Sequence, residues 1–253
     1  MDMNRSIGIV GTGALARNLF AAFKRQPHYS ITVYGRSKND AKFFSEQFCP
    51  SLDGLLSCEL IFLAVSDRAI EKLADDLETF TGILVHCSGA TPMLANKLIT
   101  GVLYPLQSFS KEQLTDFSVV PILVEGSTKE AENILVEIAN NLSRHVERAT
   151  STERLKLHLA AVFAQNFSNH LIALAQEYVK GEGLNFTLLE PLLKLGIETA
   201  IRSDAMALQS GPARRGDQIT IDKHLNLLEK HERLLHLYQT LSKSIEQTYE
   251  KDI

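Results

Sequence analysis

One helical stretch in the second half of the chain carries polar side chains on a single face. His158, Gln165 and Asn169 lie together with Val162 when residues are placed about 100° apart around a helix, and Asn166 lies at the flank. An imidazole can exchange a proton near neutral pH, and side-chain amides can hold a polar atom in place. The neighbouring residues are apolar almost all round, which predicts a buried helix, where an unpaired polar group costs about 1–3 kcal/mol. This polar stripe therefore lines a wet catalytic cleft or forms a hydrogen-bonded network between helices.

A glycine-rich segment near the start of the chain has the spacing of a dinucleotide-binding turn. Residues 11–16 read G-x-G-x-x-A and lie between an apolar run, 6–11, and a helical pattern, 14–26. In such a turn the first glycine allows the tight bend, the second lets backbone amides approach a pyrophosphate, and Ala16 permits close packing of helix on strand. The alternative is a glycine turn that binds nothing. The predicted cofactor contacts from this segment are Gly11, Thr12, Gly13, Ala14 and Leu15.

The end of the next predicted strand carries positive charge where a carboxylate would select NAD. About 20 residues after the glycines, an acid ordinarily binds the ribose hydroxyls of NAD. This chain has Gly35, Arg36, Ser37 and Lys38 at that place, and a guanidinium, a hydroxyl and an ammonium suit a 2′-phosphate. We therefore predict that the cofactor is NADP, bound by Arg36 and Ser37. The alternative is a solvated basic loop.

Two later strands are predicted to end in small residues at the same edge of the sheet. Residues 64–66 (Ala-Val-Ser) close one apolar run, and residues 86–90 (His-Cys-Ser-Gly-Ala) close another. Ligands of open α/β sheets bind at the carboxyl ends of the strands. We expect the ribose and the nicotinamide to lie against the backbone of Ala64, Val65, Ser66, Ser88 and Gly89.

These segments belong to a repeating pattern of strands and helices over the first 150 residues. Nearly uninterrupted apolar runs, such as 59–66 and 82–87, are typical of strands that are buried on both faces of a parallel sheet. The predicted fold class is α/β: a Rossmann-like, doubly wound, mostly parallel sheet followed by an all-α C-terminal domain. The predicted strands are 6–11, 31–34, 59–66, 82–87, 101–106, 119–124 and 144–148, with helices at 14–26, 39–48, 68–80 and 129–140.

The pattern changes at Thr150. Thr150 and Glu153 have the spacing of a capping box, in which hydroxyl and carboxylate satisfy each other's backbone amides at the start of a helix. Only helices are predicted beyond this point, to about 180, then at 187–209, 217–230 and 232–251. We therefore predict a Rossmann-like NADP-binding domain at 1–149 and a helical domain for substrate binding and dimerisation at 150–253. No linker-like segment separates the two domains, so we expect them to pack together.

The composition disfavours several classes of partner and site. The 26 Lys and Arg against 30 Asp and Glu give a net charge of −4 in 253 residues, without the basic field that holds nucleic acid. Eight histidines and three cysteines follow no metal-ligand spacing, so we predict no metal site and structural cysteines in a reducing compartment. No apolar run approaches the roughly 18 residues of a membrane span, and the N-terminus lacks a signal-peptide pattern. The prediction is a cytoplasmic protein without membrane or nucleic-acid partners.

Four motifs together resemble a known group of enzymes. They are the glycine fingerprint, the Gly-Arg-Ser that begins at Gly35, the segment from Tyr104 to Ser108 (Tyr-Pro-Leu-Gln-Ser), and the segment 211–217 (Gly-Pro-Ala-Arg-Arg-Gly-Asp). With them the chain resembles, over essentially its whole length, Rossmann oxidoreductases of the pyrroline-5-carboxylate reductase type. It is most similar to a branch labelled NADP oxidoreductases, whose helical second half is a domain of unknown function. Segment 211–217 lies where the pyrroline carboxylate reductases bind substrate through Ser-Pro-Gly-Gly-Thr. This chain has arginines after Gly211-Pro212, so that substrate does not simply carry over.

The resemblance and the polar stripe together suggest roles for individual residues. Related reductases place a lysine or histidine and an asparagine at the start of this helix, which favours His158 as proton donor, with Lys156 as a weaker candidate. Asn166 and Ser88 are predicted to hold a carbonyl or imine. The predicted substrate-binding residues are Gln165, Asn169, Arg215 and Asp217, whereas Arg214 suits a solvated surface equally well. The resemblance also implies a homodimer formed through the helical domain, with Arg215 able to act across its interface.

The resulting hypothesis is an NADP-dependent reductase or dehydrogenase for a small polar carbonyl, imine or hydroxy compound. Such an enzyme needs orientation, electrostatics and a proton from the protein, since NADP(H) carries the reducing chemistry. Two alternatives are an NADP-binding sensor or interaction protein without catalysis, and an enzyme that reduces NADP with a deazaflavin. Turnover and the visible absorbance of a deazaflavin distinguish the three.

Overall fold

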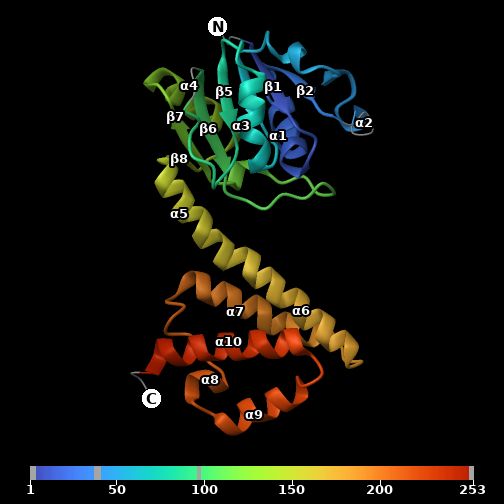
Figure 1. The fold of residues 1–253 in the computed structure, drawn as a ribbon, viewed down its shortest axis with the longest axis vertical. Coiled ribbons are helices and arrows are strands. Elements are labelled where there is room, and N and C mark those ends of the chain that lie inside the picture. Colours follow the sequence, from blue (N-terminus) through green and yellow to red (C-terminus); the bar gives the residue numbers. More distant parts are fainter. Residues whose placement is uncertain (1–3, 37–40, 96–97, 251–253) are drawn as a thin grey trace. The chain divides into compact units, whose positions relative to one another are not determined.

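The computed structural model describes residues 4–36, 41–95 and 98–250, and Figure 1 shows their fold. The chain divides into two compact units, Met1–Ala164 and Gln165–Ile253. The first unit contains the β-sheet and the helix that follows it, and the second is helical. Each unit is considered separately below.

Within the described residues, the first unit contains an eight-stranded sheet with the strand order β3-β2-β1-β4-β5-β6-β7-β8. Neighbouring strands are parallel except for β6 and β7, which are antiparallel. The fold class is therefore the predicted doubly wound, mostly parallel α/β sheet. The strands are β1 (Arg5–Val10), β2 (Tyr29–Tyr34), β3 (Phe48–Cys49), β4 (Leu60–Leu63), β5 (Ile83–His86), β6 (Ile99–Pro105), β7 (Ile122–Gly126) and β8 (Val146–Arg148).

Strand β1 is the point where the winding of the sheet reverses. It pairs with β2 on one side and with β4 on the other, so the connections after β1 and after β4 run to opposite sides of the sheet. The loops at the carboxyl ends of these two strands diverge, which leaves room for a ligand between them. The glycine-rich turn at residues 11–13 follows β1 directly and therefore lies at this point.

Helices cover both faces of the sheet, as alternate residues of β4 show. Leu60 and Phe62 pack in one core cluster with α1 (Ala14–Lys24) and α4 (Lys129–Leu142), whereas Ile61 and Leu63 pack in another with α3 (Asp67–Asp76). Because successive side chains of a strand point to opposite faces, α1 and α4 lie on one face and α3 on the other. A strand buried on both faces must be apolar throughout, which explains the uninterrupted run that predicted it.

Residues 39–48 differ from the predicted helix. Residues 37–40 lie outside the described part of the chain, α2 (Ala41–Phe44) is a single turn, and a 3-10 turn follows at Ser45–Gln47. Ser45 has a φ of 53°, which is incompatible with a continuing α-helix. Strand β3 then pairs with the end of β2 and extends the sheet. Further 3-10 turns lie at Leu52–Leu55 and Phe117–Val119.

The helical part of the chain begins at the predicted capping box. The Thr150 hydroxyl accepts from the Glu153 amide, and the Glu153 carboxylate accepts from the Thr150 amide, which starts α5 (Ser151–Ala161). The helix continues as a π-helical segment at Val162–Phe167 and then as α6 (Ser168–Gly181). The boundary between the two compact units falls after Ala164, not at residue 150 where the helices begin. Helix α5 belongs to the first unit, in which its Arg154 side chain is buried. The predicted boundary at 149/150 stays a prediction.

Within the first unit, this helix is largely exposed, and its predicted burial stays a prediction. Leu159 is 57% exposed and Phe163 is 62% exposed, and of the described α5 side chains only that of Arg154 is buried. An apolar pattern indicates that a helix face is covered, but it does not reveal whether the same chain or another one covers it. The π-helical segment Val162–Phe167 has more residues per turn than an α-helix. The polar stripe predicted with about 100° per residue therefore does not continue unchanged beyond residue 161.

The second unit consists of helices with few buried side chains. Among its described residues, the buried apolar side chains are those of Leu174, Ala213, Ile221 and Tyr249. The predicted helix 187–209 is shorter, because it begins with a 3-10 turn and ends at Arg202. The elements after α6 are the 3-10 turn Phe186–Leu189, α7 (Glu190–Arg202), α8 (Pro212–Arg215), α9 (Gln218–Leu227) and α10 (Glu232–Tyr249).

Candidate functional site

A cavity of about 920 Å³ opens where the winding of the sheet reverses. Its lining follows the carboxyl ends of β1, β2 and β4 and includes part of α3. Nine of the predicted cofactor-binding residues line it together: Gly11, Thr12, Gly13, Ala14, Leu15, Arg36, Ala64, Val65 and Ser66. Ser37 lies outside the described residues, and Ser88 and Gly89 are not among the described lining residues.

The glycine-rich turn has the shape that a bound pyrophosphate needs. Gly11 has a φ of +123°, and a Cβ there would lie 2.3 Å from the Ala64 carbonyl oxygen, so a side chain cannot be placed. A Cβ on Gly13 would meet nothing within 4 Å, which leaves its backbone open. Gly13 is the N-cap of α1, and the described first turn of that helix holds no acidic residue. The helix N-terminus therefore offers amides and partial positive charge to an anion.

Charged side chains line the cavity beyond the turn. Arg36 follows β2, as predicted, and α3 adds Lys72 and Asp76, which the sequence analysis did not single out. These two residues are four positions apart and so lie on the same face of α3. The signal that could have found them is their place on the helix after β4, which borders the diverging loops. Two cations and one carboxylate can bind a phosphorylated ribose.

A tyrosine–histidine pair, Tyr104 and His158, lies at the neighbouring strand ends. The Tyr104 hydroxyl is 3.1 Å from His158 Nδ1, and the two rings meet edge to face. In the β5–β6 register His86 lies opposite Val102, so Tyr104, two residues further, stands beside the loop after β5. A Cβ on Gly89 of that loop would lie 2.8 Å from His158 Nδ1 and 2.7 Å from Tyr104 Cζ. Only glycine allows the loop backbone to approach the pair this closely.

The chemistry of this pair begins with the protonation of Tyr104. Burial raises the pKa of the Tyr104 phenol, and the negative charge of Asp67 raises it further, although Arg154 opposes both. The phenol therefore keeps its proton at neutral pH. Tyr104 was quoted in the sequence analysis only as part of a family motif. Strand periodicity alone could not find this contact, because the partner is 54 residues away in the chain.

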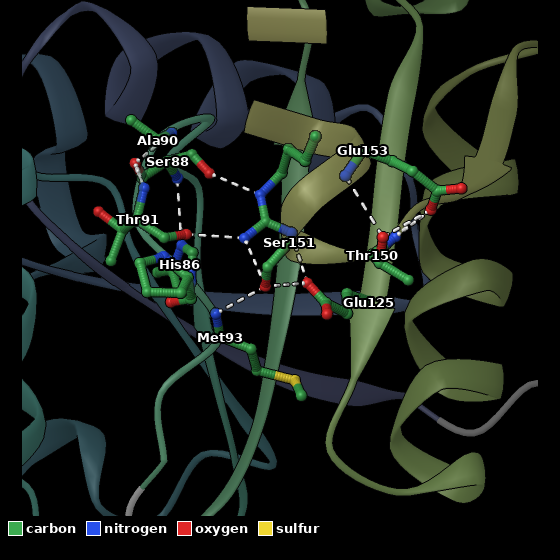
Figure 2. Close-up of polar contacts among 11 residues, drawn as sticks. His86, Ser88, Ala90, Thr91, Met93, Glu125, Thr150, Ser151 and Glu153 are labelled. Carbon is green, nitrogen blue, oxygen red and sulfur yellow. Dashed lines mark hydrogen bonds and ion pairs between the residues drawn. The ribbon is translucent and has the colours of Figure 1, made fainter. Parts of the chain in front are cut away.

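The loop after β5 is held in place by its own polar groups, as Figure 2 shows. The Ser88 hydroxyl accepts hydrogen bonds from the amides of Ala90 (3.1 Å) and Thr91 (2.9 Å). His86 accepts from the Ser88 amide at Nδ1 and therefore donates from Nε2 to the Pro92 carbonyl. Burial lowers the pKa of His86 from 6.5 to about 4, and the nearby Arg154 contributes. Ser88 thus shapes the loop, and its predicted role in holding a carbonyl stays a prediction.

The remaining predicted site residues belong to the helical part of the chain. Gln165, Asn166 and Asn169 are exposed, and they begin the second unit, beyond the unit that holds His158. Arg215 is exposed, and Lys156 of α5 is exposed too. The structure therefore places His158 beside the backbone of Gly89, but it does not test the predicted roles.

Asp217 has a local structural role in the described chain. Its carboxylate caps α9 by accepting from the amide and the hydroxyl of Thr220, at 3.1 and 2.7 Å. These hydrogen bonds lower the pKa of Asp217, with the side-chain hydroxyl as the largest cause. An N-cap carboxylate of this kind stabilises a helix start without any ligand. Its predicted contact with a substrate stays a prediction.

Other groups that could do chemistry show no further site in the described residues. The described residues include no group of three or more His, Cys, Asp or Glu side chains that could hold a metal ion. Cys49, Cys58 and Cys87 are free thiols, and burial raises the pKa of Cys87 to about 12. Within the described chain, the helices include none that is both long and apolar enough to span a membrane.

The chain is similar to a domain family and to several solved structures. Residues 120–245 match the model of a domain of unknown function, DUF2520. A Bacteroides fragilis protein, provisionally named an NADP oxidoreductase, is 31% identical with a TM-score of 0.89, over 98% of this chain and 100% of its own. The chain belongs to this family of Rossmann-type oxidoreductases with a DUF2520 domain. No curated protein shows significant similarity to the sequence.

Two further solved structures are similar to this chain. A Thermotoga maritima protein is 25% identical with a TM-score of 0.69, over 97% of this chain and 99% of its own. Pyrroline carboxylate reductase from Plasmodium falciparum, solved with NADP bound, is 13% identical with a TM-score of 0.56, over 97% of this chain and 100% of its own. At that identity the likeness shows the fold alone. The resemblance inferred from the four sequence motifs is confirmed at the level of family and fold.

Proposed function

We propose that this protein is an NADP-dependent oxidoreductase that transfers hydride between NADP(H) and a small polar carbonyl, imine or hydroxy compound. The observation that carries the proposal is the cavity in which Gly11, Gly13 and Arg36 meet at the reversal of the sheet. The family relationship supports an oxidoreductase, and the Bacteroides fragilis relative is named for NADP. The cysteine content and the sequence pattern favour a cytoplasmic location, which stays a prediction.

Each part of the cavity suits one part of the cofactor. The amides after Gly11 and at the start of α1 bind the pyrophosphate. The guanidinium of Arg36 binds the 2′-phosphate, and Lys72 adds a second positive charge. Ala64 and Val65 are small or apolar, and they line the cavity on the side of the neighbouring strand β5, toward which the nicotinamide half of the cofactor would extend. When bound, the nicotinamide supplies or accepts the hydride.

The tyrosine–histidine pair supplies the proton. In this assignment the Tyr104 hydroxyl donates a hydrogen bond to Nδ1 of the neutral His158 ring, which places the ring's own proton on Nε2. In the protonated ring, Nδ1–H donates to the phenol oxygen, and Nε2–H is directed away from Tyr104. His158 would give this Nε2 proton to the carbonyl oxygen or imine nitrogen of the substrate and would be left neutral with its remaining proton on Nδ1. Oxidation of a hydroxy compound reverses this proton transfer.

A substrate screen tests this assignment. Purified protein with NADPH is offered aldehydes, ketones and cyclic imines, and oxidation is followed by the near-ultraviolet absorbance of the reduced cofactor. His158→Asn should lower kcat by about 10²–10⁴-fold while NADPH binding is kept, because only the proton donor is lost. His145→Asn, at an exposed position of the same unit, is the matched control. Tight NADPH binding without turnover of any substrate would instead favour the sensor, and reduction of NADP by a deazaflavin would favour the third alternative.

We also propose that the protein is a homodimer through its helical unit. Leu192, Leu195 and Ile201 of α7 are 68%, 67% and 79% exposed, and apolar surface of this extent is uncommon on a monomer. A second copy of the chain is the partner that the family resemblance implies. Light scattering should give twice the mass of 28.1 kDa, and Leu195→Glu should shift the protein to the monomer. A wild-type protein that stays monomeric at high concentration would contradict the dimer.

A further inference from the structure

Arg154 is a buried charge that the proposed proton transfer does not use. It lies on α5 and is 1% exposed. Its guanidinium contacts both the loop after β5 and strand β7. Nε donates to the Ser88 carbonyl (3.2 Å), Nη2 donates to the Thr91 carbonyl (2.7 Å), and Nη1 pairs with Glu125 (2.5 Å). One planar group therefore joins three elements of the first unit.

Ser151, at the start of α5, extends this connection. Its hydroxyl donates to the Glu125 carboxylate (2.8 Å) and accepts from the Met93 amide (3.0 Å), and Arg154 Nη2 lies 3.3 Å from the same oxygen. The loop from residue 88 to residue 93 is thus bound to α5 near both of its ends. We call Arg154, Glu125 and Ser151 the arginine clamp.

Stability alone does not account for this arrangement. Removing a guanidinium from water costs several kcal/mol, and well-packed apolar residues often replace a buried ion pair without loss of stability. The clamp instead fixes the position of the loop after β5 relative to α5. The planar guanidinium binds two carbonyls of this loop and the Glu125 carboxylate, each in a defined direction. A lysine would keep the charge but could not reproduce these contacts.

The geometry that the clamp fixes is that of the proton donor. Arg154 and His158 are four residues apart on α5, so they lie on the same side of the helix. Gly89, between the two clamped carbonyls, is the residue whose backbone lies against the tyrosine–histidine pair. Displacement of the loop relative to α5 must therefore move Gly89 against the His158 ring.

We propose that Arg154 is a positioning residue that sets the distance between the Ser88–Gly89 backbone and His158, and so holds His158 in its bond to Tyr104. This inference rests on the proposed function, because it assigns the clamp to the alignment of the proton donor with the bound cofactor. Arg154 itself touches neither substrate nor cofactor in this assignment.

The test compares Arg154→Lys with wild type by two measurements that need no substrate. The ¹⁵N shifts of His158 report which ring nitrogen carries the proton, and we expect a single Nε2–H form in wild type and a mixture in the variant. Binding of adenosine 2′,5′-bisphosphate reports on the part of the cavity that would hold the adenosine half of the cofactor. Binding of NADPH reports in addition on the part that would hold the nicotinamide. We expect about tenfold weaker NADPH binding, equivalent to about 1.4 kcal/mol, with unchanged binding of the bisphosphate.

Two further variants make the test specific. Arg148→Lys is the matched control, because Arg148 is a half-exposed arginine of the same unit that binds Glu132 and no part of the loop. It should change neither measurement. Glu125→Gln keeps an acceptor for Arg154 while removing the countercharge, and it replaces Arg154→Lys if that variant does not fold. We expect it to give the same mixture of His158 forms to a smaller extent.

The outcomes distinguish a failure of the role inferred for Arg154 from a failure of the proposed function. A single Nε2–H form in Arg154→Lys would overturn the inference, and so would an equal loss of both ligands without a change at His158. If wild type binds neither ligand, the proposed function fails, while the ¹⁵N shifts still decide whether Arg154 positions His158.

Discussion

Acid should destabilise this protein through His86. The imidazole is fully buried between the Ser88 amide and the Pro92 carbonyl, and its burial lowers its pKa from 6.5 to about 4. In the unfolded chain His86 takes up a proton below about pH 6.5, whereas in the folded chain it does so only near pH 4. The stabilising effect of neutral His86 is therefore complete above pH 6.5 and is lost progressively as the pH falls toward 4.

The size of the effect follows from the two pKa values. Their difference, 6.5 against about 4, corresponds to roughly 3 kcal/mol at about 1.4 kcal/mol for each pKa unit. Between about pH 7.5 and pH 4.5 the loss is roughly 2–3 kcal/mol, because the folded histidine has begun to take up its proton at the lower pH. This is a large part of the roughly 5–15 kcal/mol that stabilises a typical protein.

The assay is urea unfolding across this pH range, for wild type and for His86→Gln. Glutamine keeps a donor and an acceptor but does not titrate, so the other titrating groups cancel in the difference between the two curves. Wild type should lose roughly 2–3 kcal/mol more than the variant on acidification. Parallel curves would refute the argument, and so would an NMR titration of His86 with its midpoint near 6.5.

Three substitutions test local features of the same unit. Thr150→Ala removes the N-cap of α5 and should cost about 1 kcal/mol in urea unfolding, whereas Thr150→Ser should cost little; equal losses would contradict the capping role. Gly89→Ala should disrupt the tyrosine–histidine pair, seen as loss of the single Nε2–H form in ¹⁵N spectra, while Gly196→Ala, in open space on α7, leaves it intact. Gly13→Ala meets no protein atom within 4 Å, so the fold should persist while calorimetry shows that NADPH binding is lost; binding equal to wild type would exclude a pyrophosphate at that backbone.

The sequence alone could predict the sheet and the glycine-rich half of the cavity. Strands such as β4 are continuous apolar runs because both faces are covered, and the turn at Gly11 has a local backbone requirement that appears directly as glycine. The capping box at Thr150 is local too, and it was confirmed to the residue. Features of this kind depend on neighbours in the chain, so spacing reveals them.

The contacts that the sequence could not reveal join distant segments. Tyr104 and His158 are 54 residues apart, and Arg154 reaches a loop more than 60 residues earlier in the chain. The π-helical segment at Val162–Phe167 was also missed, because a constant helical angle was assumed. The roles predicted for Gln165, Asn166, Asn169 and Arg215 stay predictions.

Binding of NADPH and NADH measured side by side tests the central claim most directly. Wild type and Arg36→Ala are each titrated with both nucleotides by calorimetry. The account predicts that wild type prefers NADPH and that Arg36→Ala loses about tenfold or more of its NADPH affinity, with little change for NADH, because a charged hydrogen bond to the 2′-phosphate is removed. Equal affinity for both nucleotides, or no binding of either, would contradict the assignment of this cavity to NADP.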